Sequence, residues 1–249
     1  MRRIIPGLAI LGVFCLSVPA AAEAQTLPFL PFGGEEGGGT EQVSLALQLL
    51  IAITVISVAP AIVLMTTAFI RVVIVLSFIR QAMGVHNMPP NQVIIGLALF
   101  LTIFIMSPVL KEINSEALQP YLNEDIAEEE AFGRAVQPMR EFMFSQVREK
   151  DLKLMVEVAD QDRPENLEDV NTWTLIPAFM LTELKRAFTI GFMIFVPFLI
   201  IDMITASVLM TMGMLMLPPV IVSLPFKVLL FVLVDGWHLV VGSLVQSFQ

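Results

Sequence analysis

The chain has 249 residues, of which 56% are hydrophobic, and its mean hydropathy is +0.81. This composition excludes an ordinary soluble enzyme and predicts a membrane or membrane-complex protein. The formal net charge of −9 comes entirely from residues 111–176, which hold 16 acidic and 7 basic side chains, and no basic, aromatic-rich patch suggests a partner nucleic acid.

Residues 1–24 have the three parts of a secretory signal peptide. Two arginines precede an apolar stretch at 4–18, and an Ala-x-Ala pattern ends at Ala24. We expect cleavage after Ala24, which would also remove Cys15, the only cysteine; an uncleaved short anchor is the alternative. Residues 25–41 are rich in proline and glycine and are predicted to form a flexible linker.

Residues 42–110 are predicted to form an N-terminal apolar helical hairpin. The stretch 42–70 carries no charge and is long enough to cross the hydrocarbon layer, with a predicted kink at Pro60. A continuous helix over 43–83 would be about 60 Å long, twice the thickness of a bilayer core. We therefore expect this stretch to turn or to be buried in protein, before a Gly- and Pro-containing break at 84–91 begins the return run.

Residues 111–176 are predicted to form an acidic helical insertion outside the cytoplasm. Apolar residues recur there three and four positions apart, the spacing of one face of an amphipathic helix. Such a stripe is usually a packing face and not a cofactor site. The residues of this stripe are Phe132, Val136, Met139, Met143 and Val147.

Residues 177–249 are predicted to form a C-terminal apolar hairpin that contains costly charges. Asp202 has 15 uncharged residues before it and 24 after it, so a helix-end residue that reaches the interface is a poor explanation for it. Asp202 and Lys227 stand 11 and 14 residues from Gly213, which predicts similar depths in the two arms. We predict that both are structural charges that face protein, and their direct pairing remains open at this point.

A second charge pair is predicted between Arg148 and Glu183. Arg148 lies in the amphipathic part of the acidic segment, and Glu183 opens the apolar C-terminal half. The hypothesis is that the two pair within one subunit or between neighbours, and that they dock the acidic segment on the apolar helices.

The charge distribution also predicts a topology. With the mature N-terminus outside, Arg71 and Arg80 lie on the cytoplasmic side, as the positive-inside rule requires, and they fall on opposite faces of one helix. The acidic segment is then outside, and the last two runs form a hairpin whose turn points inward. Lys185 and Arg186 then lie on the outer side, against the rule, and the inward turn has no charge. Both features argue against a simple four-span insertion.

The turn between the last two apolar runs carries four of the fifteen methionines within seven residues, followed by two prolines. Methionine is flexible and polarizable and adapts to irregular apolar partners. A ring of such side chains could close a pore and still yield to a passing chain, whereas the plainer alternative is ordinary packing. Gly213 and the proline pair Pro218-Pro219 favour a pore, because they break the helix where the methionines lie.

Three stretches of this sequence resemble the FliP family of flagellar type III export-gate proteins, over nearly all of the mature chain. The sequence departs from that family mainly at Thr189, where a polar or charged residue such as Gln or Lys is usual, and at Leu215, which lies outside these stretches and where Met is usual. The three stretches are Met88–Pro108 (MPPNQVIIGLALFLTIFIMSP), Pro177–Phe192 (PAFMLTELKRAFTIGF) and Leu224–Trp237 (LPFKVLLFVLVDGW).

The resemblance implies an all-α, membrane-complex protein of long kinked helical hairpins that assembles into a helical oligomer. It implies a homo-pentamer in one complex with FliQ and FliR, with FlhB at the entrance, FliO assisting assembly, and unfolded flagellar proteins as cargo. The expected location is the bacterial inner membrane within the flagellar basal body, in contact with membrane lipids. The methionine turn would be the gasket of the closed channel, in which Met214, Leu215 and Met216 line the narrowest part and Met210 and Met212 support them.

Three other classes of protein have a composition compatible with this sequence. An enzyme would need a nucleophile–base pair or metal ligands, yet His86 and His238 are isolated and no HExxH, GxSxG, P-loop or GxGxxG motif occurs, so we expect no catalytic residue, cofactor or metal. A solute transporter could use Asp202 and Lys227 as a coupling pair, but would be expected to show internal repeats. The equivalent subunit of a virulence injectisome usually lacks a signal peptide and Gly-rich lead.

Overall fold

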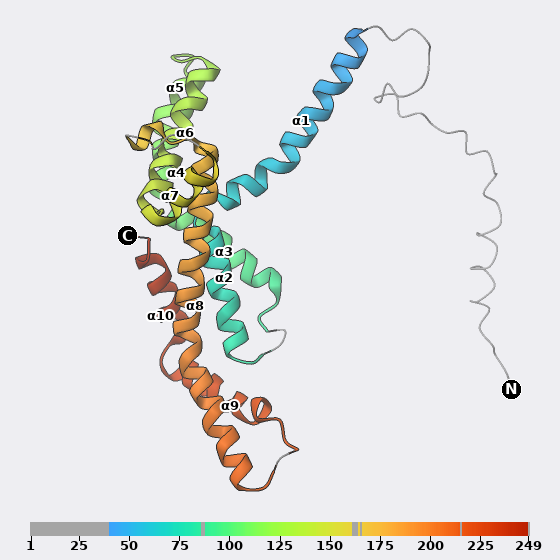
Figure 1. Cartoon of the computed structure of the whole chain (residues 1–249), viewed down its shortest axis with the longest axis vertical. Helices are drawn as coiled ribbons and strands as arrows, with labels where there is room; N and C mark the ends of the chain where they lie inside the picture. The colour runs from blue at the N-terminus through green and yellow to red at the C-terminus, as the bar shows by residue number, and fades with distance from the viewer. Residues whose placement is uncertain (1–39, 86–87, 161–163, 165, 215, 249) are drawn as a thin grey trace, which may run out of the picture. The chain divides into compact units, whose positions relative to one another are not determined.

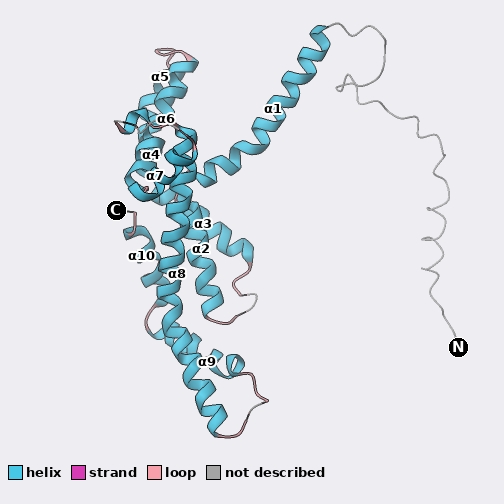
Figure 2. Cartoon of the chain, in the orientation of Figure 1, coloured by secondary structure: helices cyan, strands magenta, loops and turns pink. Residues whose placement is uncertain are grey.

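The structure is a computed structural model that describes residues 40–85, 88–160, 164, 166–214 and 216–248. The predicted signal peptide, His86, Leu215 and nearly all of the predicted linker lie outside the described residues. Within these ranges every regular element is helical, which confirms the all-α prediction (Figures 1 and 2). The elements are α1 (Thr40–Met65), α2 (Phe69–Ala82), α3 (Asn91–Ile105), α4 (Ser107–Ile113), the π-helical turn η1 (Asn114–Leu118), α5 (Gln119–Leu122), α6 (Glu128–Gln146), α7 (Glu149–Val158), the 3₁₀ turn η2 (Leu167–Asp169), α8 (Thr172–Thr211), α9 (Pro219–Leu233) and α10 (Gly236–Gln246).

The chain divides into two compact units, Met1–Ser57 and Val58–Gln249. The long apolar stretch predicted over 43–83 is interrupted, as expected, because α1 ends at Met65 and α2 begins at Phe69. No glycine or proline marks this break. Thr66 Oγ1 donates to Ile62 O at 3.0 Å and Thr67 Oγ1 donates to Leu64 O at 3.2 Å. Such local bonds compete with the helical pattern and explain how a threonine pair can end a helix.

The main core of the second unit lies between α2, α3, α8 and the C-terminal helices. Buried residues of α2 recur at helical spacing, which gives this helix one continuous packing face. That face packs along α8, and α3 folds back on α2. The principal buried residues of this core are Val72, Val75, Leu76, Ile79, Ala98, Ala187, Phe198, Phe231 and Leu244.

The predicted amphipathic helix of the acidic segment is α6, and only part of its stripe is buried. Phe132 is 73% exposed, whereas Met143 is almost completely buried. Met143 packs with Val170, Leu175 and Phe179 in a second core that joins α6 to the first turns of α8. The short helix α7 also packs on α8, so α6 and α7 of the acidic segment form a helical layer on α8.

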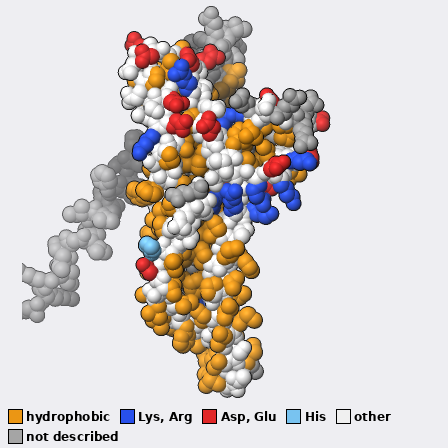
Figure 3. Space-filling model, turned by 90° about the vertical axis from the view of Figure 1, so that its left-hand side faces the viewer, with side chains coloured by type: hydrophobic (Ala, Val, Ile, Leu, Met, Phe, Trp, Pro, Cys, Tyr) orange, Lys and Arg blue, Asp and Glu red, His pale blue; other side chains and the backbone are white. Residues whose placement is uncertain are grey.

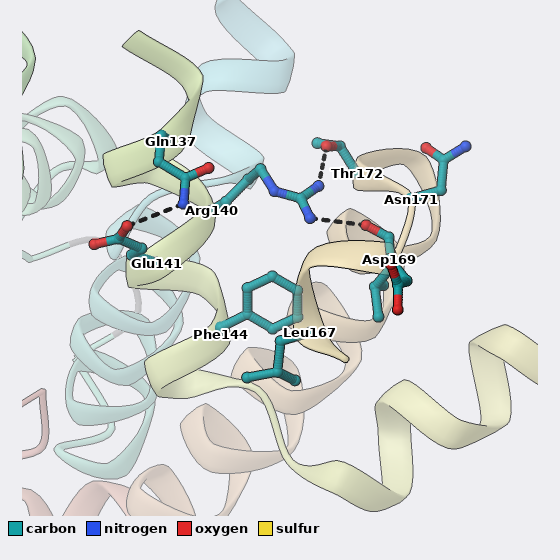
Figure 4. Close-up of a pocket in the computed structure, with 9 residues that line it drawn as sticks. Gln137, Arg140, Glu141, Phe144, Leu167, Asp169, Asn171 and Thr172 are labelled. Carbon is teal, nitrogen blue, oxygen red and sulfur yellow. Dashed lines mark hydrogen bonds between the residues drawn. The ribbon is translucent and has the colours of Figure 1, made fainter. Parts of the chain in front are cut away.

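The beginning of α8 is fixed by polar contacts to α6. Asn171 accepts a hydrogen bond from the Trp173 N–H at 3.0 Å, which caps the helix. Arg140 of α6 reaches across a cleft of about 830 Å³, donating to Val170 O at 2.8 Å and to Thr172 Oγ1 (Figure 4). The helix thus begins at Thr172, five residues before the predicted start of the C-terminal hairpin.

By length and composition, two described helical segments could cross a membrane, Ala46–Met65 and Thr172–Thr211. Two bent pairs could each provide one more span. The pair Asn91–Ile105 and Ser107–Leu122 is bent by 59°, and the pair Pro219–Leu233 and Gly236–Gln246 is bent by 63°. The second bend occurs at Asp235, whose φ of 50° lies in the left-handed region. The apolar helices are therefore compatible with a membrane location.

Candidate functional site

The methionine turn begins with a well-formed helix stop. Gly213 has a φ of +74°, a conformation that glycine adopts without the strain of a Cβ atom. Its N–H donates to Met210 O at 3.0 Å, and the Met214 N–H donates to Leu209 O at 3.0 Å. These two bonds form a Schellman motif, which satisfies carbonyls that the end of α8 would otherwise leave unpaired. The predicted break at Gly213 is confirmed.

The side chains of this turn are exposed although they are apolar. Met216 is 98% exposed, and Met210, Met212 and Met214 are between 41% and 66% exposed. Pro218 precedes α9 and Pro219 occupies its first position, so a new helix starts directly after the turn. The turn is therefore a short, backbone-defined loop that presents thioethers without charge.

An apolar groove of about 510 Å³ runs between α8 and α9 beside this turn. Met212 and Met214 form one end of it, and Phe226 lies on the α9 side. Its other lining residues are Ile201, Ile204, Thr205, Val208, Leu209 and Val222.

The two arms of the hairpin are joined by a buried charge pair. Lys227 is 3% exposed, and its Nζ lies 2.6 Å from Asp202 Oδ2. Ser223 donates its hydroxyl to the other carboxylate oxygen, so both oxygens of Asp202 are engaged. A Cβ atom on Gly84 would lie 3.8 Å from Lys227 Nζ, which puts the end of this lysine beside the turn that follows α2. The direct pairing, which the similar arm lengths left open, is present in the structure, while its part in assembly stays a prediction.

A second buried cluster centres on Arg71, the first basic residue of α2. Its Nε donates to Glu183 Oε2 at 2.7 Å, and neither side chain is accessible to solvent. Its other nitrogens donate to Ser247 O at 2.8 Å and to Gln146 Oε1 at 3.1 Å. The guanidinium carbon also lies 3.6 Å from the centre of the Phe248 ring. One arginine thus ties α2, α6, α8 and the C-terminal residues together.

The predicted pair between Arg148 and Glu183 does not form within this chain. Glu183 is taken by Arg71, and Arg148 Nε donates to Asp151 Oδ2 at 2.8 Å. Thr182 connects the two sites, because it donates to Asp151 Oδ2 at 2.7 Å and accepts from the Arg148 N–H at 3.2 Å. Arg148 therefore docks the acidic segment on α8 through Asp151 and Thr182, and not through Glu183.

The pKa of Asp151 reflects its contacts with Arg148 and Thr182. Burial raises its pKa, but hydrogen bonds from Thr182 and Arg148, together with the positive charges of Arg148 and Lys185, lower it further than burial raises it. The net result is a pKa below the ordinary value of 3.8.

The contact between Arg71 and Glu183 also corrects the predicted topology. That prediction placed Arg71 on the cytoplasmic side and the start of the C-terminal hairpin on the outer side, yet these residues touch. Further along, the Phe78 ring lies 5.4 Å from the Phe188 ring, so α2 and α8 run in the same direction. In the predicted N-terminal hairpin, the helix that packs along α8 is therefore α2. The topology prediction treats 42–83 as one membrane crossing, whereas α1 and α2 are separate helices and Arg71 lies at the start of the second.

Sequence reasoning missed the role of Arg71, Gln146 and Ser247. The sequence analysis uses Arg71 only to predict topology, although an arginine at the end of an uncharged stretch is as costly to bury as Asp202 and also calls for a partner. Its partners are 75 to 176 residues away in the sequence, so no local pattern names them. Among the described residues, no three His, Cys, Asp or Glu side chains are grouped so that they could hold a metal ion.

Comparison with known proteins assigns a family to these features. The model of the FliP family matches residues 52–244. The flagellar biosynthetic protein FliP of Bacillus subtilis strain 168 is 59% identical over 84% of this chain and 94% of that protein. Its counterpart in Caulobacter vibrioides is 47% identical over 100% of this chain and 92% of the relative, and that of Borreliella burgdorferi is 43% identical over the full length of both.

Proposed function

The chain belongs to the FliP family of flagellar biosynthetic proteins, and on this premise we propose that it is a pore-forming subunit of the flagellar type III protein export gate. Its cargo would be unfolded flagellar proteins that cross the inner membrane. The apolar helices are compatible with that membrane, and the family membership makes it a component of flagellar biosynthesis and export, with no catalytic activity assigned.

The methionine turn is the observation that carries this proposal. An export pore must block ions and small solutes at rest, which an apolar constriction does by excluding water. It must also admit a chain of any sequence, and thioethers on flexible stems can reshape around varied side chains. The turn between α8 and α9 supports both needs, because its methionines are exposed, uncharged and held on a defined backbone. In the proposal, Met214, Leu215 and Met216 line the narrowest part, supported by Met210 and Met212.

The pore requires several copies, because one turn cannot surround a channel. We propose a homo-pentamer in one complex with FliQ and FliR, with FlhB at the entrance and FliO needed for assembly. The exposed apolar side chains of α8 and α9 support such an assembly, since an apolar surface of this extent needs protein or lipid against it. Asp202, Lys227, Arg71 and Glu183 would hold each subunit in the shape that assembles.

Native mass measurement of the detergent-extracted complex tests this part of the proposal. Tagged full-length chain, expressed with its flagellar partners, should purify as one species that contains five copies of the chain together with FliQ and FliR. A stable monomer without these partners, from membranes in which all of them are present, would contradict the proposal.

An independent solute transporter is the second candidate, and the buried Asp202–Lys227 pair is the observation that favours it. Against it, both oxygens of Asp202 already have partners in the chain, so neither is left for a coupling ion. Reconstitution of the chain alone into liposomes separates the two, because a gate subunit should give no specific solute flux. The injectisome counterpart is less favoured, since the relatives reported above are flagellar proteins.

A further inference from the structure

A cavity of about 310 Å³ opens beside the Arg71 cluster and is lined by four basic side chains. Helices α2 and α8, the residue that precedes α7 and the C-terminal residues contribute to it. Its lining residues are Arg71, Arg148, Lys185, Arg186, Thr189, Ile190 and Ser247.

The cavity has more positive than negative charge. Glu183 pairs with Arg71 and Asp151 pairs with Arg148, so two of the four cations have a carboxylate partner. Arg186 donates to the side-chain oxygen of Gln146 at 2.8 Å, which is a neutral acceptor. The Lys185 side chain makes no hydrogen bond or ion pair with the part of the chain that the structure describes, although its charge acts on Asp151 from a distance. Four cations therefore face two carboxylates at this cavity, and the excess of two positive charges favours an anionic ligand.

The position of the cavity indicates where that anion comes from. Lys185 and Arg186 are the last charged residues before the uncharged stretch 187–201 of α8. Lys185 shares its helical face with Phe188 and Phe192, which follow it by three and seven residues and are both more than half exposed. On the face drawn in Figure 3, basic side chains form a band between the acidic part and the apolar part. Basic residues at such a border lie at the level of lipid headgroups.

We propose that this cavity binds the phosphate group of an anionic phospholipid, with Lys185 and Arg186 as its ligands. The acyl chains then lie along the apolar face of α8 that carries Phe188 and Phe192. A soluble anion would satisfy the two charges but would leave this apolar face uncovered, and for that reason the lipid is the better occupant. The inference rests on the chain lying in a membrane, and not on its forming a pore.

The test is native mass spectrometry of the full-length chain in detergent, titrated with phosphatidylglycerol or with zwitterionic phosphatidylcholine. Near an anionic lipid surface each basic side chain contributes about a fivefold gain in affinity, so Lys185→Gln with Arg186→Gln should weaken phosphatidylglycerol binding by about 30-fold. Phosphatidylcholine should bind more weakly to the wild type and should not distinguish the two proteins.

Two control variants make the result specific. Lys150→Gln with Lys153→Gln removes the same charge from exposed positions of α7 that do not line the cavity, and it should leave binding unchanged. Lys185→Arg with Arg186→Lys keeps both charges and should retain binding, which also shows that the helix tolerates substitution there. Equal phosphatidylglycerol binding by the wild type and the Gln pair would overturn the proposal. Complete competition by inorganic phosphate at the affinity of the lipid would assign the cavity to a soluble anion and overturn the lipid assignment.

Discussion

At the scale of single residues, the hairpin depends on a charge pair of which the lysine is almost completely buried. Lys227 is buried among apolar side chains, and its ammonium group has Asp202 as its carboxylate partner. Removing one partner of a buried pair leaves an uncompensated charge and typically costs about 3–5 kcal/mol, whereas removing both costs much less.

Lys227→Met should therefore lower the free energy of unfolding by about 3 kcal/mol, and adding Asp202→Leu should recover most of that loss. Denaturant unfolding of the detergent-solubilised chain, followed by circular dichroism, measures both effects. Arg134→Met is the matched control, because it breaks the exposed pair with Glu130 and should cost no more than about 0.5 kcal/mol. Additive losses in the double variant would mean that the two charges do not stabilise each other.

Asp151 gives a second prediction at this scale. Its pKa in the folded chain lies below the ordinary value of 3.8, so its contribution to stability is present above the unfolded value and is lost as the pH falls through the lowered folded value. Asp151→Asn should be less stable than the wild type near neutral pH, and the difference should shrink below about pH 4. Unfolding midpoints measured over this pH range test it, with exposed Glu157→Gln as a control that should follow the wild type.

At the scale of elements, α2 and α8 approach each other closely at Gly191. A Cβ atom at this position would lie 2.7 Å from the Cγ and Cδ2 atoms of Phe78. These atoms are near the base of the ring, and the ring also packs edge-to-face on Phe188, so they cannot move aside without separating the helices.

Gly191→Ala should therefore destabilise the chain by about 1–3 kcal/mol, although alanine is the better helix former. Gly133→Ala provides the comparison, because Gly133 is an exposed helical residue with no atom within 4 Å of the added methyl group. That variant should be stabilised by up to about 1 kcal/mol. Thermal unfolding of both variants gives the contrast, and equal stabilisation of the two would show that the helices do not approach closely at Gly191.

The elements themselves were largely predictable. Runs without charge, and the breaks at Gly84 and Gly213, marked the helices because glycine and proline act locally. The position of the break after Met65 could not be predicted. Thr66 and Thr67 end the helix through side-chain hydrogen bonds to the backbone, and no local sequence pattern indicates these bonds. The partner of Asp202 could be inferred from two arms of similar length. The partner of Glu183 could not, because Arg71 lies in another hairpin 112 residues away.

At the scale of the whole molecule, the two buried charge clusters of the second unit fix the helices on either side of the methionine turn. The Arg71 cluster fixes α8 to α2, α6 and the C-terminal residues, and the Asp202–Lys227 pair fixes α9 to α8. The Schellman motif and the proline pair then define the loop between them. A gasket needs this arrangement, because its backbone must stay in place while its side chains move.

The permeability of cells that express the complete gate tests this account most directly. Replacing Met214, Leu215 and Met216 together by alanine should leave the complex assembled but allow ions or a small dye to enter, since alanine is too short to meet its counterparts across an axis. The matched control replaces two exposed methionines and one leucine of α8, Met193, Leu199 and Met203, by alanine, and should stay sealed. Unchanged permeability of the turn variant, in a complex shown to be assembled, would contradict the account. These methionines would then be ordinary packing residues that do not seal a channel.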